Sequence, residues 1–155
     1  MGRVYEWNTY AYSTDANVAG RVMEELERTV GLTTKNLVEA SRPEDAPLHK
    51  EFEWNNDIAG EKFREMQAGK MITNLKVVIK QDETKKIRGF VTLEHSVGRP
   101  GTFERTEKVL EVTEKRNRLL TLAIKELQAF RKKYIMLSEL AELFDIIDKL
   151  GKESA

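Results

Sequence analysis

The sequence contains no cysteine, only 3 prolines and only 2 histidines in 155 residues. Without cysteine the chain can form neither a disulfide framework nor a thiolate site, which suits a reducing compartment. No run of about 18 apolar residues occurs, so we expect no transmembrane helix. The first residues also lack the apolar stretch of a signal peptide. These absences predict a cytoplasmic protein without a membrane partner.

Signals of catalysis are equally scarce. His49 and His95 lie far apart and outside any HExxH spacing, and the glycines form neither a P-loop nor a dinucleotide-binding pattern. No serine stands in a nucleophile motif. His49 could form a weak cation site with Glu51, Glu53 and Asp57, but a loop histidine held by hydrogen bonds fits better. We therefore predict that the protein is not an enzyme, with no catalytic residue, no metal ligand and no cofactor.

The charge is balanced overall but unevenly distributed. Residues 1–57 carry 6 Lys and Arg against 11 Asp and Glu, residues 58–135 carry 18 against 10, and residues 136–155 carry 2 against 5. A basic middle is compatible with a patch for nucleic acid. It is equally compatible with oppositely charged ends that meet in an oligomer, and solvated helix faces would also explain it.

The N-terminal part predicts a docked arm followed by two short helices. The aromatic residues within positions 5–12 are too many for a free tail, so we expect an arm that packs on the domain with little regular structure. Thr14 or Asp15 can cap a first helix, and Gly31 can end it. Thr33 can cap a second helix, which the prolines after residue 42 interrupt.

The loop of residues 42–54 is predicted to be ordered. It carries Leu48, Phe52 and Trp54 within a few residues, although loops are usually polar. We expect these side chains to pack back onto the helices, with Trp54 as the clamp.

A third helix is predicted from Asn55–Asp57 to about Asn74. Its inner face would hold the apolar residues Ala59, Phe63, Met66 and Ile72. Its opposite face would carry the polar residues Asn56, Arg64, Gln67 and Asn74, together with Gly60. Arg and Gln side chains read base edges in the major groove of DNA, so Arg64 and Gln67, with Lys70 on a phosphate, are the predicted DNA contacts. A solvated polar face is the alternative, and the loop before this helix is longer than a helix-turn-helix turn.

Two short segments rich in β-branched residues, 75–79 and 87–93, predict a β-hairpin around the polar turn KQDETKK. Residues 98–101 then form a loop. Lys85, Lys86 and Arg88 could rest on a phosphate backbone as a basic wing. Lysines that protect an edge strand from aggregation are the equally good alternative.

Residues 106–150 contain no glycine or proline and predict either one long helix or a helical hairpin bent near Leu137-Ser138. Apolar residues recur close to a heptad spacing along this segment. A stripe this wide must be buried, against the rest of the chain or against a second copy. The predicted oligomerisation residues are Leu127, Phe130, Tyr134, Leu137 and Phe144.

The predicted fold is therefore mainly α with a small β-hairpin, an α+β fold. It would have three parts: helix-turn-helix-like helices with the arm in residues 1–74, the hairpin and its loop in 75–102, and the C-terminal helical arm in 103–155.

Two segments resemble conserved phage and prophage proteins of unassigned function. They are GLTTKNLVEASRPEDAPLHKEFEWNNDIAGEKFREMQAGKMI (residues 31–72) and LLTLAIKELQAFRKKYIMLSELAELFDIID (residues 119–148). The first is similar to that group's pattern of a short helix, an SPLH-x-x-FEW loop and an Ala-rich helix. This chain has Gly60 and Gly69-Lys70 where the group tends to have Ala and Arg. The resemblance implies a small phage-encoded DNA-associated or regulatory protein of the host cell.

Two functional hypotheses follow. The first is a non-enzymatic DNA-binding or nucleoprotein factor whose C-terminal arm holds a homo-oligomer together. The alternative is a protein-interaction module, such as a phage inhibitor, adaptor or assembly factor, which binds a host or phage protein through its C-terminal helices.

Overall fold

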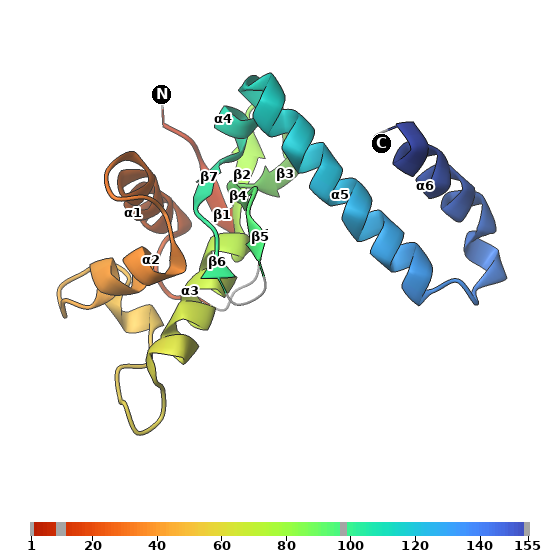
Figure 1. The fold of residues 1–155 in the computed structure, drawn as a ribbon. Coiled ribbons are helices and arrows are strands. Elements are labelled where there is room, and N and C mark those ends of the chain that lie inside the picture. The colour runs from red at the N-terminus through yellow and green to blue at the C-terminus, as the bar shows by residue number, and fades with distance from the viewer. Residues whose placement is uncertain (1, 9–11, 97–98, 154–155) are drawn as a thin grey trace. The chain divides into compact units, whose positions relative to one another are not determined.

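The computed structural model describes residues 2–8, 12–96 and 99–153, and it confirms the α+β class (Figure 1). The chain forms two compact units, residues 1–108 and residues 109–155. Within the described residues no helix is both long and apolar enough to cross a membrane.

The first unit begins with two capped helices, as the sequence predicts. Helix α1 (Ala16–Arg28) starts after Asp15, whose carboxylate accepts hydrogen bonds from the backbone N–H groups of residues 17 and 18. The helix ends as Gly31, with φ of +94°, donates its N–H to Leu26 O at 2.7 Å. The Thr33 hydroxyl then accepts from Asn36 N at 3.0 Å and caps α2 (Thr34–Ser41).

After α2 the chain passes through a short 3-10 helix, η1 (His49–Glu51), to α3 (Glu61–Asn74). Helix α3 therefore starts later than the predicted Asn55–Asp57. The reason is local: residues 55–59 form turns in which the N–H groups of Ile58 and Ala59 both donate to Asn55 O.

The described part of the N-terminal arm contains more regular structure than expected. It forms strand β1 (Tyr5–Trp7), which pairs antiparallel with β2 (Leu75–Ile79). The predicted hairpin of β2 with β3 (Asp82–Arg88) is confirmed, so the three strands make one sheet in the order β1-β2-β3. Pairing already begins at Asp82, so the turn is shorter than the predicted KQDETKK.

Two further strand pairs belong to this unit. Strand β4 (Phe90–Thr92) pairs with β7 (Phe103–Arg105), and the two-residue strands β5 (His95–Ser96) and β6 (Arg99–Pro100) pair with each other. The predicted loop of residues 98–101 thus contains β6, and its first residue lies outside the described ranges. Helix α4 (Thr106–Glu111) follows β7.

One apolar core holds the first unit together. Its fully buried members come from α1, α2, α3, the sheet and the 42–54 loop, and they include Met23, Leu37, Leu48, Met71 and Phe90. Because the loop contributes Leu48 and Phe52 to this core, its predicted packing onto the helices is confirmed.

The second unit is a helical hairpin, which decides between the two predicted forms of the C-terminal segment. Helix α5 (Thr113–Lys133) is followed by a turn, the 3-10 helix η2 (Ser138–Leu140) and α6 (Ala141–Glu153). The Arg131 guanidinium pairs with the Asp148 carboxylate at 2.9 Å and joins the two helices.

Candidate functional site

Arg64 is predicted from the sequence to lie on the exposed polar face of α3, and this prediction is wrong. Its side chain is only 2% exposed, because the guanidinium reaches back under the loop that precedes α3. Its nitrogens donate to Glu53 O at 2.9 Å, Trp54 O at 3.3 Å, Asn56 Oδ1 at 2.5 Å and Glu61 Oε1 at 2.8 Å. With its guanidinium buried and bonded to these four groups, Arg64 holds the loop in place and presents no group to a DNA base.

The predicted inner face of α3 is rotated in the structure. Ala59 and Ile72 are buried as predicted, but Phe63 is 48% exposed and Met66 is 60% exposed. The buried side of the helix is instead formed by Arg64, Ala68, Met71 and Ile72. The loop carbonyls require donors, and Arg64 can supply them only when it faces inward. The apolar residues on the neighbouring side therefore face solvent.

The other two predicted DNA contacts on α3 do not form a cluster with Arg64. Gln67 is half-buried, and its side-chain oxygen accepts from Glu53 N at 3.5 Å. Lys70 is exposed. Of the three residues, only Lys70 is free to approach a phosphate.

Trp54 sits among charged and aromatic groups of the loop. Its ring stacks on His49 with centroids 4.9 Å apart, and its indole N–H donates to His49 O at 2.7 Å. The guanidinium groups of Arg42 and Arg64 lie 5.5 Å and 5.3 Å from the ring centroid. These contacts support the predicted role of Trp54 as the clamp of the loop.

His49 is held by its surroundings in the manner of a structural histidine. Its Nδ1 lies 3.0 Å from Ser41 O. The neighbouring Glu51 carboxylate accepts from the N–H and hydroxyl groups of Ser13 and Thr14. In the described ranges, no three or more His, Asp or Glu side chains are grouped as metal ligands would be.

Two residues of the predicted basic wing, Lys86 and Arg88, are part of a wider basic face on the three-stranded sheet. Strand register places Glu6 opposite Lys76, and Lys76 opposite Arg88. Because side chains alternate along a strand, these residues and Lys86 share the outer face, while Tyr5, Val77 and Ile87 face the core. Lys86 forms an ion pair with Glu6, and Arg88 is exposed. Lys85 belongs to the opposite side of the strand and pairs loosely with Asp82 at 3.9 Å.

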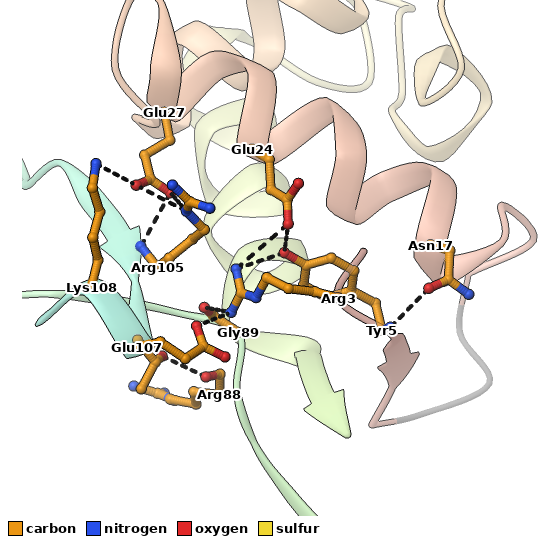
Figure 2. A network of polar contacts seen from close by, with 11 residues as sticks. Arg3, Tyr5, Asn17, Glu24, Glu27, Arg88, Gly89, Arg105, Glu107 and Lys108 are labelled. Atoms are coloured by element: carbon orange, nitrogen blue, oxygen red, sulfur yellow. Dashed lines mark hydrogen bonds and ion pairs between the residues drawn. The ribbon is translucent and has the colours of Figure 1, made fainter. Parts of the chain in front are cut away.

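Sequence reasoning missed a polar network that joins the N-terminal strand to the start of α4 (Figure 2). Arg3 donates to Gly89 O at 2.8 Å and to Tyr5 Oη at 2.7 Å, and it pairs with Glu107 at 2.7 Å. The Tyr5 hydroxyl donates to Glu24 at 2.7 Å. Burial and this acceptor raise the pKa of Tyr5 well above its usual range, so the phenol stays protonated.

A second part of the same network centres on Glu27, whose side chain is only 6% exposed. Its carboxylate binds Arg105 at 3.3 Å and Lys108 at 3.5 Å (Figure 2). These partners lie 78 and 81 residues after Glu27 in the sequence. No sequence motif predicts a contact over such a separation. The network therefore fastens the sheet and the 105–108 segment to α1.

The C-terminal hairpin buries few of its apolar residues. Ile124, Phe144 and Ile147 are buried where the helices meet. Phe144, at 5% exposure, is thus used within the hairpin and is not available as a predicted oligomerisation residue. Phe130 and Leu137 remain substantially exposed, while Leu127 and Tyr134 are half-buried.

Comparison with protein-family models, curated proteins and solved structures found no match. Two surfaces of the described chain are distinctive: the basic sheet face and the exposed apolar residues of the helical hairpin.

Proposed function

We propose that this protein is a non-enzymatic interaction module that binds another protein through the apolar side of its C-terminal hairpin. The observation that carries the proposal is the exposure of large apolar side chains on a two-helix unit. Two packed helices bury only the stripe where they touch, so a further apolar side is stable in water only when another element covers it. The resemblance to phage and prophage proteins makes an assembly factor or adaptor of the host cytoplasm the fitting role.

The second unit has several exposed apolar residues, and their number favours a contact site over a chance scatter of single apolar residues on the surface. They include Leu120, Phe130, Ile135, Met136, Leu137, Leu143 and Ile146, each at least 38% exposed. Singly scattered apolar residues need no explanation, whereas a concentration on one small unit marks a contact site.

The test is retention of a partner by the tagged full-length chain in bacterial cell extract. Ile146→Lys places a charge on the apolar side of α6, and Ile58→Lys makes the same change at a 70% exposed position of the first unit. We expect one or more proteins of the extract to be retained by the wild type and by Ile58→Lys but not by Ile146→Lys. Identical retention by both variants would exclude the hairpin as the functional surface.

DNA binding is the second candidate, and the basic sheet face is the observation that favours it. Lys76, Lys86 and Arg88 surround a single acidic residue, Glu6, on that face. Three cations on a rigid sheet can meet a phosphate backbone, and their contribution to binding falls steeply with salt. Lys70 would add a phosphate contact from α3, whereas Arg64 would contribute only through the fold.

A light-scattering mass with and without a mixed-sequence duplex, at low and at moderate salt, separates the two candidates. A salt-sensitive increase in mass with the duplex, reduced by Arg88→Ser, would support DNA binding. No increase at low salt would remove this candidate.

A further inference from the structure

The apolar side of the hairpin is built from one stripe on each helix. On α5 the stripe follows spacings of three and four residues through Leu119, Ala123, Leu127 and Phe130, and it ends at Tyr134, the C-cap of the helix. On α6 it follows the same spacings through Leu143, Ile146 and Leu150. Neither stripe is the contact line between the helices, which consists of Ile124 and Arg131 on α5 and of Phe144, Ile147 and Asp148 on α6.

Helical geometry places both stripes on the same broad side of the hairpin. With about 3.6 residues per turn, each stripe lies roughly a quarter turn counter-clockwise from the contact line of its own helix, seen from that helix's N-terminus. The two helices run antiparallel, as the turn between Lys133 and Ala141 requires (Figure 1). In an antiparallel pair, the same rotation from the contact line leads to the same side. The second unit is therefore a two-helix layer with one apolar side and one polar side.

We infer that a second copy of this chain covers the apolar side, so that two hairpins form a four-helix bundle. This inference rests on the proposed function and names the partner. A two-helix layer with an apolar side is one half of such a bundle, and the same side on a second copy is self-complementary about a twofold axis. A two-layer bundle then buries the exposed residues Phe130, Leu143 and Ile146 in its centre.

Charge selects the arrangement of the two copies. Helix α5 carries seven Lys and Arg against two Asp and Glu, a net of +5. Helix α6 carries two against four, a net of −2. A twofold axis parallel to the helices places α5 of one copy over α6 of the other, so opposite charges meet. A twofold axis perpendicular to the helices would instead place α5 on α5. This arrangement is disfavoured because it brings two strongly basic helices together, and like charges repel.

The register of the hairpin predicts which residues meet between the copies. Arg131 is level with Asp148 through their ion pair, and Gln128 lies beside Gly151. Phe130 is therefore level with residues 149 and 150. With the axis parallel to the helices, Phe130 of one copy lies over Leu150 of the other.

The first experiment is the mass of the purified full-length chain over a concentration series, without nucleic acid. We expect a dimer that dissociates on dilution. Ile146→Lys should raise its dissociation constant at least about thirtyfold, the loss typical of a central interface residue. Ile58→Lys should leave it unchanged. Because Ile146 is 53% exposed, the variant should keep its helical circular dichroism; if it does not, Leu143→Lys replaces it. A wild-type monomer at all concentrations, or a variant as dimeric as the wild type, would overturn the inference.

Disulfide cross-linking tests the arrangement, because the natural chain has no cysteine. Chains carrying Phe130→Cys are mixed with chains carrying Leu150→Cys and oxidised. Cross-links between the two kinds of chain should exceed those between like chains. Preferential linking of Phe130→Cys chains to each other would overturn the arrangement.

The two proposals fail in different ways. If the purified chain is monomeric but loses a retained partner on Ile146→Lys, the inference fails and the interaction module stands. If Ile146→Lys changes neither the mass nor the retained proteins, both fail.

Discussion

Replacement of Arg64 by methionine should destabilise the first unit by about 3 kcal/mol. Methionine preserves most of the buried aliphatic volume, so the change chiefly removes the guanidinium. Two backbone carbonyls, Glu53 O and Trp54 O, lose their donor, and each deprived group costs about 1–3 kcal/mol. The pair with Glu61, whose side chain is 52% exposed, adds no more than about 1 kcal/mol.

The natural tryptophans make this measurement specific. The chain has 2 tryptophans, Trp7 and Trp54, and both belong to the first unit, so their fluorescence reports its unfolding separately from that of the helical hairpin. At a urea dependence of about 1.5 kcal/mol per molar, a loss of about 3 kcal/mol lowers the unfolding midpoint by about 2 M.

Lys70→Met on the same helix is the matched control. Lys70 is exposed, so its replacement should change the unfolding free energy by less than about 0.5 kcal/mol. An unchanged urea midpoint for Arg64→Met, together with weakened binding to duplex DNA, would refute the structural role and restore Arg64 as a DNA contact.

Two further substitutions test the core and the N-terminal arm. A Cβ at Gly20 would lie 2.1 Å from the ring of Tyr5, and the hydrogen bonds of Tyr5 hold that ring in place. Gly20→Ala should therefore lower the free energy of unfolding by about 2 kcal/mol, even after the better helix propensity of alanine is counted. Gly60→Ala, with open space around it, should cost no more than about 1 kcal/mol, the difference between glycine and alanine at the N-cap of α3, and equal thermal midpoints for the two variants would contradict the packing. Burial opposes ionisation of Glu51, yet its hydrogen bonds, chiefly from Thr14, outweigh burial and lower its pKa. A lowered folded-state pKa gives stability that is present above the unfolded value of about 4.3 and is lost as pH falls through the folded value. The urea midpoint of the wild type should therefore fall as the pH is lowered below about 4.3, and that of Glu51→Gln should fall less steeply. Equal dependence of the two midpoints on pH would contradict the hydrogen bonds of Glu51 with Ser13 and Thr14.

Local sequence signals predicted the elements whose stability is decided within a few residues. Asp15 and Thr33 cap helices because their side-chain oxygens reach N–H groups two or three residues ahead. The β-branched segments at 75–79 and 87–93 indicated the hairpin for a similar local reason. Apolar spacing also identified the C-terminal helices, although it left one helix and a hairpin equally possible.

Predictions about which face of an element is buried were less secure. Periodicity assigns the apolar side of α3 to the core, and this assignment failed at Phe63 and Met66. The helix is rotated because Arg64 must face inward to donate to the carbonyls of Glu53 and Trp54, about ten residues earlier in the chain. No pattern within the helix predicts these contacts. Of the two surfaces predicted for DNA, the face of α3 loses Arg64, whereas Lys86 and Arg88 of the predicted basic wing lie on the outer face of the sheet.

By itself, the sequence determined the fold class, the helix caps, the hairpin strands and an amphipathic C-terminal segment, because propensity, capping and periodicity act over one or two turns of chain. Only the tertiary structure decided that Arg64 faces inward, that residues 5–7 join the sheet, that Phe144 is used within the hairpin, and that Glu27 gathers Arg105 and Lys108. In each of these cases a buried polar or apolar group had to find its partner, and that partner lay at a distance along the chain that only folding brings together.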